Sequence, residues 1–386
     1  MKQAFYADKV FLADQLLNQM YVLTEGDRFM GVAQQAPADH TVIDWSGYWL
    51  GPGLVDTHIH GLMGYDVMDN QAQGLANMSR GLLRCGVTSF LPTTLTSGVP
   101  AITDVVATIG EVHQQLSGAR VQGIFIEGPF FTEKHKGAQN PAYFMPPDKT
   151  LVDRWQQCSG GLIRKVALAP EYGESEAFIE HLRAQDIVVA LAHSDATYDQ
   201  AMAAVGAGAT VFTHTFNGMS GLHHREPGMV GAAMRTQGTY KELICDGFHV
   251  HPATSQILMD VCGRDQVVLV SDSIRAAGMS AGTYHLGEFQ VTMADGQARL
   301  QDGTLAGSTL LLKDGVKNVV NQGLATPRQA LNMASLNAAK SVGMEQVCGQ
   351  IAPSYLADFT LWAPDMTLVA TYLGAEQRYV AERICP

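Results

Sequence analysis

Eight short apolar segments recur between residues 53 and 270, and longer segments with helical spacing separate them. Such continuous apolar segments are typical of parallel strands that are buried on both faces. Segments such as 175–185 and 199–206 would provide helical, right-handed crossovers between neighbouring strands. Eight alternating strand and helix units predict an α/β fold, namely a TIM-like (β/α)8 barrel. The apolar segments are residues 53–57, 87–91, 121–126, 165–169, 187–192, 210–213, 242–245 and 267–270.

The two ends of the chain show a different pattern, in which apolar and polar residues alternate between turn signals such as Glu25-Gly26-Asp27. Neither end is long enough to bury a core alone. We therefore expect residues 1–52 and 345–386 to form one small β-sandwich domain, and residues 53–344 to form the barrel domain with the hydrolytic site. A hairpin-like segment, 284–299, would either reach over the barrel mouth or join the small domain.

The composition narrows the class of protein. Only 16% of the 386 residues are charged and 46% are hydrophobic, which indicates a large buried core. The net charge of −12 disfavours nucleic-acid binding, because an acidic surface repels phosphate backbones. The N-terminus contains Asp8, Lys9 and Asp14 where a signal peptide would be apolar, and no segment predicts a membrane span. Six widely spaced cysteines, from Cys85 to Cys385, form no CxxC pair, so we expect reduced thiols and a cytoplasmic protein.

A His-x-His motif follows the first apolar segment, where His58 and His60 would share one face of an extended strand. Alone, this pair is as consistent with hydrogen-bonded histidines as with a metal site. Four later segments, however, are each followed closely by another residue of a metal-ligand type. Because the carboxyl ends of barrel strands meet at one face, these side chains would converge, and they predict a metal site. The four residues are Glu127, His193, His214 and Asp272.

The predicted ligand set contains imidazole and carboxylate groups but no thiolate. Such a set suits Zn²⁺, Fe²⁺, Mn²⁺ or Co²⁺, and among these we favour zinc. An ion of this kind lowers the pKa of bound water to roughly 7, so that water becomes a nucleophile near neutral pH. Asp272 is the candidate general base and acid, with a helix cap as its alternative role. The ligand set therefore predicts hydrolysis at a polarised carbonyl carbon.

Seven longer motifs extend these candidate residues. They are Glu127-Gly-Pro, Ala192-His-Ser, Thr213-His-Thr-Phe-Asn-Gly-Met, Arg225-Glu-Pro-Gly, Asp246-Gly-Phe-His, Ser271-Asp-Ser and Gly303-Thr-Leu-Ala-Gly-Ser. In this order they resemble the N-acetylglucosamine-6-phosphate deacetylase family of the amidohydrolase superfamily, including its N-acetylgalactosamine-6-phosphate branch. The resemblance extends from about residue 51 to residue 359. It implies a metal-dependent enzyme that removes the acetyl group of an amino-sugar 6-phosphate.

The resemblance also implies roles for individual residues. Glu127, His193 and His214 would bind the hydrolytic metal ion. A homodimer is also implied, because in the family an arginine equivalent to Arg225 reaches the site of the neighbouring subunit. Asp272 would transfer the proton. A phosphate dianion suits a guanidinium, an imidazole and the backbone N–H groups of a glycine turn. The residues implied to bind the sugar phosphate are Ala138, Asn217, Gly218, Arg225, Asp246, His249, Leu305, Ala306 and Gly307.

Two features call for comment against the family pattern, the histidine pair at positions 58 and 60 and the glutamine at position 139. Some members lack the histidines at positions 58 and 60 and work with one metal ion, whereas His58 and His60 here permit a second, so the number of ions stays open. Many members have a histidine that polarises the acetyl carbonyl at the position of Gln139. Glutamine donates a hydrogen bond but carries no charge, so polarisation would depend more on the metal or on a neighbour such as His135.

We therefore expect an enzyme of amino-sugar catabolism that converts N-acetylglucosamine-6-phosphate to glucosamine-6-phosphate and acetate. N-acetylgalactosamine-6-phosphate is an alternative substrate, because the motifs do not define the orientation of a single hydroxyl group. An amidohydrolase acting on a cyclic amide or an N-acyl amino acid is a second alternative. A non-catalytic sugar-phosphate sensor would have lost the general base or the ligands, but Asp272 and the histidines are present.

Overall fold

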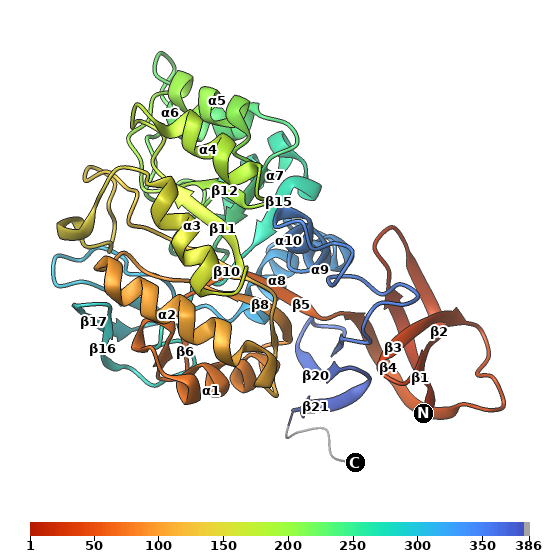
Figure 1. Ribbon diagram of the computed structural model, residues 1–386. Coiled ribbons are helices and arrows are strands. Elements are labelled where there is room, and N and C mark those ends of the chain that lie inside the picture. Colours follow the sequence, from red (N-terminus) through yellow and green to blue (C-terminus); the bar gives the residue numbers. More distant parts are fainter. Residues whose placement is uncertain (382–386) are drawn as a thin grey trace.

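The computed structural model describes residues 1–381, and in it all eight apolar segments contribute to parallel strands (Figure 1). The strands are β5 (Leu54–Ile59), β8 (Val87–Pro92), β9 (Arg120–Val121), β10 (Ile124–Ile126), β11 (Ile163–Leu168), β12 (Val188–Leu191), β13 (Val211–Phe212), β14 (Tyr240–Leu243) and β15 (Val267–Leu269). They form a three-stranded sheet, β5-β8-β9, and a six-stranded sheet, β10 to β15 in chain order. The third apolar segment, expected as one strand, is divided into β9 and β10.

Hydrogen-bonded bridges connect these two sheets along both edges. At one edge Thr93, which follows β8, pairs in parallel with Phe125 of β10. At the other edge Ile59 of β5 pairs in parallel with Ser273, which follows β15. The two sheets therefore form one curled parallel arrangement, and the carboxyl ends of its strands lie on the same side.

Helices lie around the outside of this curled sheet (Figure 1). They are α1 (Ala72–Leu83), α2 (Val99–Val112), α3 (Lys149–Cys158), α4 (Ser175–Arg183), α5 (Tyr198–Ala207), α6 (Gly228–Arg235), α7 (Pro252–Cys262), α8 (Leu312–Asn321), α9 (Pro327–Met333) and α10 (Leu336–Ser341). In α4, Phe178, Ile179 and Leu182 are buried at helical spacing, which anchors one face of the helix. The helices expected near 175–185 and 199–206 are confirmed as α4 and α5.

Strands from both chain ends form a single seven-stranded sheet beside the curled parallel sheet (Figure 1). They are β1 (Lys2–Phe11), β2 (Leu16–Glu25), β3 (Arg28–Ala33), β4 (Thr41–Pro52), β19 (Phe359–Trp362), β20 (Leu368–Leu373) and β21 (Glu376–Val380), in the order β21-β20-β19-β4-β1-β2-β3. Phe5 and Phe359 lie on strands separated by β4, yet their ring centroids are 4.8 Å apart. Arg28 of β3 also bridges to Leu356, ahead of β19. The sheet is therefore strongly curved around one core.

The hairpin-like segment forms a three-stranded antiparallel sheet of β16 (Gly282–Leu286), β17 (Phe289–Ala294) and β18 (Gln297–Arg299). Its Leu286 and Val291 pack in one apolar cluster with Leu95 and Ile274, which follow β8 and β15. Of its two expected positions, the segment therefore occupies the one over the mouth of the curled sheet. The remaining short elements are β6 (Gly61–Leu62), β7 (Tyr65–Asp66), η1 (Val67–Asp69), η2 (His113–Gln115), η3 (Pro141–Tyr143) and η4 (Arg264–Gln266).

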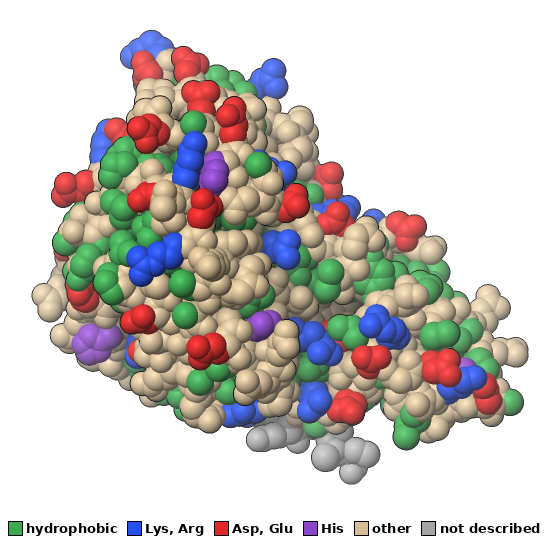
Figure 2. All heavy atoms as spheres, viewed as in Figure 1, with side chains coloured by type: hydrophobic (Ala, Val, Ile, Leu, Met, Phe, Trp, Pro, Cys, Tyr) green, Lys and Arg blue, Asp and Glu red, His purple; other side chains and the backbone are tan. Residues whose placement is uncertain are grey.

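Three further features concern the surface and the cysteines. None of the helices within residues 1–381 is long and apolar enough to cross a membrane. Lys and Arg side chains are interspersed with Asp and Glu over the face shown in Figure 2. Five cysteines are free thiols, and four of these are buried. Cys385, the sixth, belongs to residues 382–386, outside the described part of the chain.

Candidate active site

A pocket of about 220 Å³ opens at the carboxyl ends of the parallel strands, beside Leu286 of β16. Five of the six residues predicted to bind metal or transfer protons line this pocket, and all six are buried. The sixth, His58, lies directly behind them, with Nε2 3.3 Å from Oδ1 of Asp272. The chain thus brings together side chains from positions 58 to 272. The five lining residues are His60, Glu127, His193, His214 and Asp272.

Glu127, His193 and His214 form a compact group that we call the first triad. Oε1 of Glu127 lies 3.2 Å from Nε2 of His193 and 3.2 Å from Nε2 of His214. The two Nε2 atoms are themselves 3.2 Å apart. An ion bound tetrahedrally at about 2.0–2.1 Å would hold its ligand atoms roughly 3.3 Å from one another. The spacing of the first triad therefore fits such an ion.

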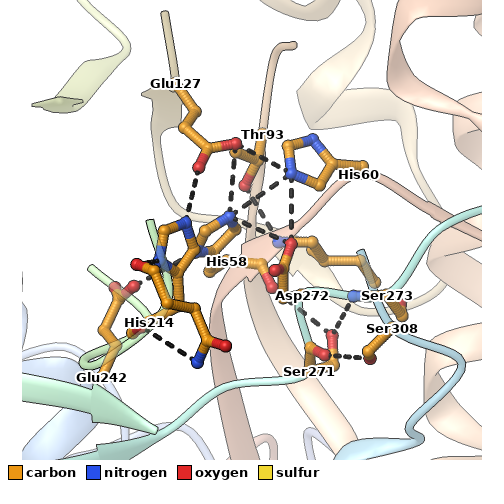
Figure 3. A network of polar contacts seen from close by, with 12 residues as sticks. His58, His60, Thr93, Glu127, His214, Glu242, Ser271, Asp272, Ser273 and Ser308 are labelled. Atoms are coloured by element: carbon orange, nitrogen blue, oxygen red, sulfur yellow. Dashed lines mark hydrogen bonds and ion pairs between the residues drawn. The ribbon is translucent and has the colours of Figure 1, made fainter. Parts of the chain in front are cut away.

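His58, His60 and Asp272 form the second triad, beside the first (Figure 3). The distances between Nε2 of His58, Nε2 of His60 and Oδ1 of Asp272 are all 3.3 Å. Glu127 connects the triads, because its second carboxylate oxygen, Oε2, lies 3.0 Å from Nε2 of His60 and 3.6 Å from Nε2 of His58. The two oxygens of one carboxylate thus face different triads.

The hydrogen bonds of the imidazole rings define which nitrogen atoms face the first triad. Nδ1 of His193 lies 3.1 Å from the carbonyl oxygen of His135, and Nδ1 of His214 lies 3.0 Å from that of Asn217. Because a carbonyl oxygen only accepts, each Nδ1 carries a proton, and in the neutral rings each Nε2 presents a lone pair. Lone pairs of three atoms 3.2 Å apart repel one another unless a cation lies between them. The donor set of the first triad therefore fits a metal ion.

The second triad is attached to the backbone of two strands. The N–H group of Asp272 donates to the carbonyl oxygen of His58 over 2.9 Å, and its carbonyl oxygen accepts from Ser308 N–H over 2.8 Å. The hydroxyl of Thr93 accepts from the N–H group of Ile59 over 2.9 Å. The bond to His58 holds the end of β5 against the segment after β15, Ser308 holds that segment from its other side, and Thr93 ties β5 to the end of β8. The second triad is therefore formed where the two sheets meet.

Three residues of the triads have positive φ angles, 44° at His193, 32° at His214 and 46° at Asp272. Residues other than glycine rarely adopt this left-handed conformation, and such strain concentrates at functional sites. Each of the three lies within three residues of a strand end, where the chain leaves the sheet. Histidine and aspartate adopt this conformation more often than most other residue types, and the contacts around the site hold it in all three.

The charges of the cluster compensate one another. Burial lowers the pKa of His60, but the carboxylates of Asp272 and Glu127 outweigh this effect and raise its pKa to about 9. The same balance raises the pKa of His58 well above its usual value. Burial raises the pKa of Asp272, but His58 and His60 outweigh it and lower that pKa to about 2. The buried carboxylates therefore stabilise positive charge next to them, and a divalent cation would supply such charge.

Most residues predicted to bind the sugar phosphate lie at the pocket, with three exceptions. Asp246 lies behind His249, whose Nδ1 is 2.6 Å from Oδ2 of Asp246. The side chain of Ala306 is buried in the apolar cluster beneath β16–β18 and lies outside the pocket lining. Arg225 is exposed, lies 2.7 Å from the ring of His224 and does not line the pocket of its own chain. The lining residues are Ala138, Asn217, Gly218, His249, Leu305 and Gly307.

Gly218 illustrates why the turn after β13 needs glycine. Its φ is 62°, and a Cβ atom there would approach Nδ1 of His193 to 2.9 Å. The carbonyl oxygen of Gly218 also accepts a hydrogen bond from Ser194 N–H over 3.0 Å. A side chain at this position would displace a first-triad ligand, so the glycine permits both the turn and the site.

Gln139, which lies outside the predicted set of site residues, also lines the pocket. Its amide nitrogen donates to Oε2 of Glu127 over 3.0 Å, and its amide oxygen accepts from Thr96 N–H over 3.0 Å. His135, considered as a substitute for carbonyl polarisation, instead directs its ring to Asp195 at 3.0 Å and lies outside the pocket lining. Gln139 is therefore the neutral donor that touches both the pocket and a metal-ligand candidate.

Sequence reasoning missed two charged residues at the base of the site, Lys165 and Glu242. Both side chains are fully buried, and Oε2 of Glu242 lies 3.1 Å from Nδ1 of His58. The sequence did contain a signal, since each of these charged residues lies in an otherwise apolar strand segment. Because burying an unpaired charge is unfavourable, two such residues would be expected to pair with each other. Leu95 and Thr304 also line the pocket without having been predicted.

Comparison with known proteins agrees with this geometry. The sequence model of the amidohydrolase family matches residues 49–378. The chain belongs to the amidohydrolase family. An N-acetylglucosamine-6-phosphate deacetylase from Vibrio furnissii is 41% identical over 326 residues, covering 84% of this chain and 81% of that protein. An N-acetylgalactosamine-6-phosphate deacetylase from Escherichia coli O157:H7 is 40% identical over 323 residues, covering 83% of this chain and 85% of that protein.

Solved structures extend the match across this amidohydrolase. One holds an aspartate-to-alanine variant of N-acetyl-D-glucosamine-6-phosphate deacetylase from Mycobacterium smegmatis, in complex with N-acetyl-D-glucosamine-6-phosphate. It superposes with a TM-score of 0.93 at 29% identity, covering 98% of this chain and 100% of that one. The resemblance seen in the sequence motifs is therefore confirmed at the level of the family.

Proposed function

We propose that this amidohydrolase hydrolyses the N-acetyl group of N-acetylglucosamine-6-phosphate, producing glucosamine-6-phosphate and acetate in amino-sugar catabolism. One observation carries the proposal: two triads of potential metal ligands lie at the base of a pocket that Asn217, Gly218 and His249 also line. Within each triad the ligand atoms lie 3.2–3.3 Å apart, and the carboxylate of Glu127 faces both triads. Relatives at about 40% identity that carry the names of amino-sugar-phosphate deacetylases support the same activity. Acetate release from the phosphorylated sugar tests it.

The proposed cofactor is one or two divalent metal ions, with zinc favoured over iron, manganese and cobalt. The first triad would hold one ion and the second triad the other, with Glu127 facing both. Such an ion supplies Lewis-acid polarisation of a carbonyl group and activation of water at neutral pH.

Asp272 is the proposed general base and acid. Its carboxylate lines the pocket, and it is ionised at neutral pH, as a general base must be, because the neighbouring histidines outweigh the effect of burial and lower its pKa. A C–O bond forms as water attacks the amide carbon, and Asp272 takes the proton that water loses. The C–N bond then breaks, and Asp272 returns the proton to the nitrogen of the departing amine.

The remaining pocket residues are proposed to bind the sugar and its phosphate. The imidazole of His249 and the backbone of the turn at Asn217 and Gly218 would meet the dianion, and Asp246 would orient the ring of His249. Ala138, Leu305 and Gly307 would contact the sugar, and Ala306 would support that loop from beneath.

A homodimer is proposed to supply Arg225. The residue is exposed and lies outside the pocket of its own chain, and the pocket's other phosphate candidates include no guanidinium. An arginine contributed by the second subunit would add the bidentate donor that a phosphate favours. The site of each subunit would then be incomplete without its partner.

N-acetylgalactosamine-6-phosphate is the second candidate substrate. The galactosamine-type relative is 40% identical and the glucosamine-type relative 41%, so overall similarity does not separate the two epimers. Side-by-side turnover of both sugars tests the choice, with the unphosphorylated sugars as controls. Activity on a cyclic amide or an N-acyl amino acid is the remaining alternative, and it would need no phosphate.

The finer architecture is also proposed. The two parallel sheets, joined at both edges, would constitute a closed (β/α)8 barrel over residues 53–344. Residues 1–52 and 345–386, of which 382–386 lie outside the described part of the chain, would form the β-sandwich domain. Cytoplasmic location is proposed because the five described cysteines are free thiols, as is usual in reducing compartments.

A further inference from the structure

Beneath the second triad, three side chains form a continuous polar chain inside the curled sheet. Nδ1 of His58 lies 3.1 Å from Oε2 of Glu242, and Nζ of Lys165 donates to the other oxygen, Oε1, of the same carboxylate. All three side chains have no exposed surface. They come from β5, β14 and β11, so the chain of contacts spans the interior between strands that are distant in sequence.

Lys165 has further contacts that fix its position. Its ammonium group donates to the carbonyl oxygen of Thr57 over 2.9 Å, one residue before His58. It also lies 3.7 Å from the centre of the Phe125 ring, which in turn lies edge-on to His58 with centroids 5.0 Å apart. Lys165 therefore holds the backbone that carries His58 as well as the carboxylate that faces its ring.

This arrangement determines the orientation of His58. A carboxylate accepts but does not donate, so Nδ1 of His58 is the protonated nitrogen and Nε2 points to His60 and Asp272. A carboxylate behind a metal-binding histidine orients the ring and increases its basicity. Lys165 compensates the charge of Glu242, which would otherwise be buried without a partner.

The two triads differ in this respect. The Nδ1 atoms of His193 and His214, in the first triad, face backbone carbonyl groups. In the second triad, Nδ1 of His60 is buried without a hydrogen-bond partner among the described residues. In the second triad, the ring of His58 is thus oriented by a charged side chain. The rings of the first triad are oriented by the backbone instead.

We propose that Glu242 and Lys165 are positioning residues that create the affinity of the second triad for a metal ion, independently of the first triad. The inference rests on the proposed function in one respect, since it assumes that the triads bind divalent ions. It follows that loss of this buried pair removes the second ion and leaves the first in place.

The test is the number of ions bound per chain at controlled free Zn²⁺. The full-length protein is stripped with a chelator, dialysed against a series of buffered Zn²⁺ concentrations and analysed by inductively coupled plasma mass spectrometry. The double variant Lys165→Met/Glu242→Met removes both charges together and leaves no unpaired buried ion. We expect two ions in the native chain and a second dissociation constant raised roughly 10- to 100-fold in the variant.

Lys241→Met provides a matched control. Lys241 is another buried lysine, adjacent to Glu242 on β14, but its ammonium group binds Thr236, Thr239 and Gln266, away from both triads. This variant should bind two ions with native affinities. The double variant Lys165→Gln/Glu242→Gln also removes both charges and keeps polar side chains at both positions, so it supplies the same comparison if the Met variant fails to fold.

The outcomes are distinct. Three results would overturn the inference. The pair variants could bind two ions with native affinity, the native chain could bind only one ion, or Lys241→Met could lose the second ion to the same extent. If the native chain binds two ions, the pair variants lose one and no amino-sugar phosphate is deacetylated, the proposed substrate is wrong and the inference on the second triad stands.

Discussion

The Nε2 atoms of His193 and His214 lie 3.2 Å apart, although each ring already directs Nδ1 to a backbone carbonyl oxygen. Two facing imidazole lone pairs are unfavourable without a cation between them, and Oε1 of Glu127 adds a third acceptor at 3.2 Å from both. This arrangement of the two Nε2 atoms supports a metal ion more directly than any sequence motif does. A motif gives only the residue types, whereas the structure also gives the distance between the atoms and shows that each proton is on Nδ1.

Metal removal should lower both activity and stability. An ion that binds the folded chain alone stabilises it by about 4 kcal/mol when its free concentration is about 1,000 times the dissociation constant. We therefore expect chelation to lower the unfolding temperature measured by differential scanning calorimetry, and added Zn²⁺ to restore it together with acetate release. An unfolding temperature that responds to neither treatment would contradict the metal site.

Replacement of Asp272 by Asn should reduce kcat roughly 10²- to 10⁴-fold, because an amide cannot take the proton from water. Steady-state kinetics on the sugar phosphate give the result. Asp246→Asn is the matched control, since Asp246 contacts His249 rather than the triads and should raise KM more than it lowers kcat. Native kcat in Asp272→Asn would remove this residue from the proposed role.

Arg225 should act on the neighbouring subunit's substrate. Arg225→Ala should raise KM for the phosphorylated sugar, and at low substrate it should be nearly inactive, as should Asp272→Asn. Mixed by unfolding and refolding together, the two variants should recover about a quarter of native activity, because a mixed dimer has one intact site. No recovery, in a mixture shown to contain mixed dimers, would mean that Arg225 does not act across the interface.

Gln139 should contribute through both of its hydrogen bonds. Gln139→Met leaves the N–H group of Thr96 without its buried partner and frees Oε2 of Glu127, so we expect a loss of about 1–3 kcal/mol in the free energy of unfolding. Gln139→His retains a donor for Glu127 and should keep more activity than Gln139→Met. Urea denaturation and kinetics of the two variants give this comparison, and equal stability of Gln139→Met and the native chain would contradict the prediction.

Much of the fold could be predicted because it depends on local pattern. The eight apolar segments lie in strands, and α4 and α5 begin and end within three residues of their expected bounds. The division of the third segment into β9 and β10 occurs at Gln122 and Gly123, a polar residue and a glycine with a φ of 153°, whereas the sequence prediction is one continuous strand across them. The single curved sheet built from both chain ends depends on long-range contacts such as Phe5 with Phe359.

The part of the candidate site that lies at the strand ends could be predicted, because the carboxyl ends of parallel strands meet at one face of the sheet. Residue type and position after a strand identified the six triad residues, and the structure brings them together. The positive φ angles at His193, His214 and Asp272 were not predicted, because histidine and aspartate tolerate this conformation but only the folded chain shows which of them adopt it. Lys165 and Glu242 were missed for the same reason, since only the folded chain shows that the two charges pair.

The most direct test of the central claim is acetate release from N-acetylglucosamine-6-phosphate and N-acetylgalactosamine-6-phosphate, each with and without prior chelation. The unphosphorylated sugars serve as controls. We predict turnover of N-acetylglucosamine-6-phosphate that chelation abolishes and Zn²⁺ restores, with little turnover of either control. No release from any phosphorylated amino sugar by metal-loaded protein, or release that persists after the ions are shown to be removed, would contradict the account.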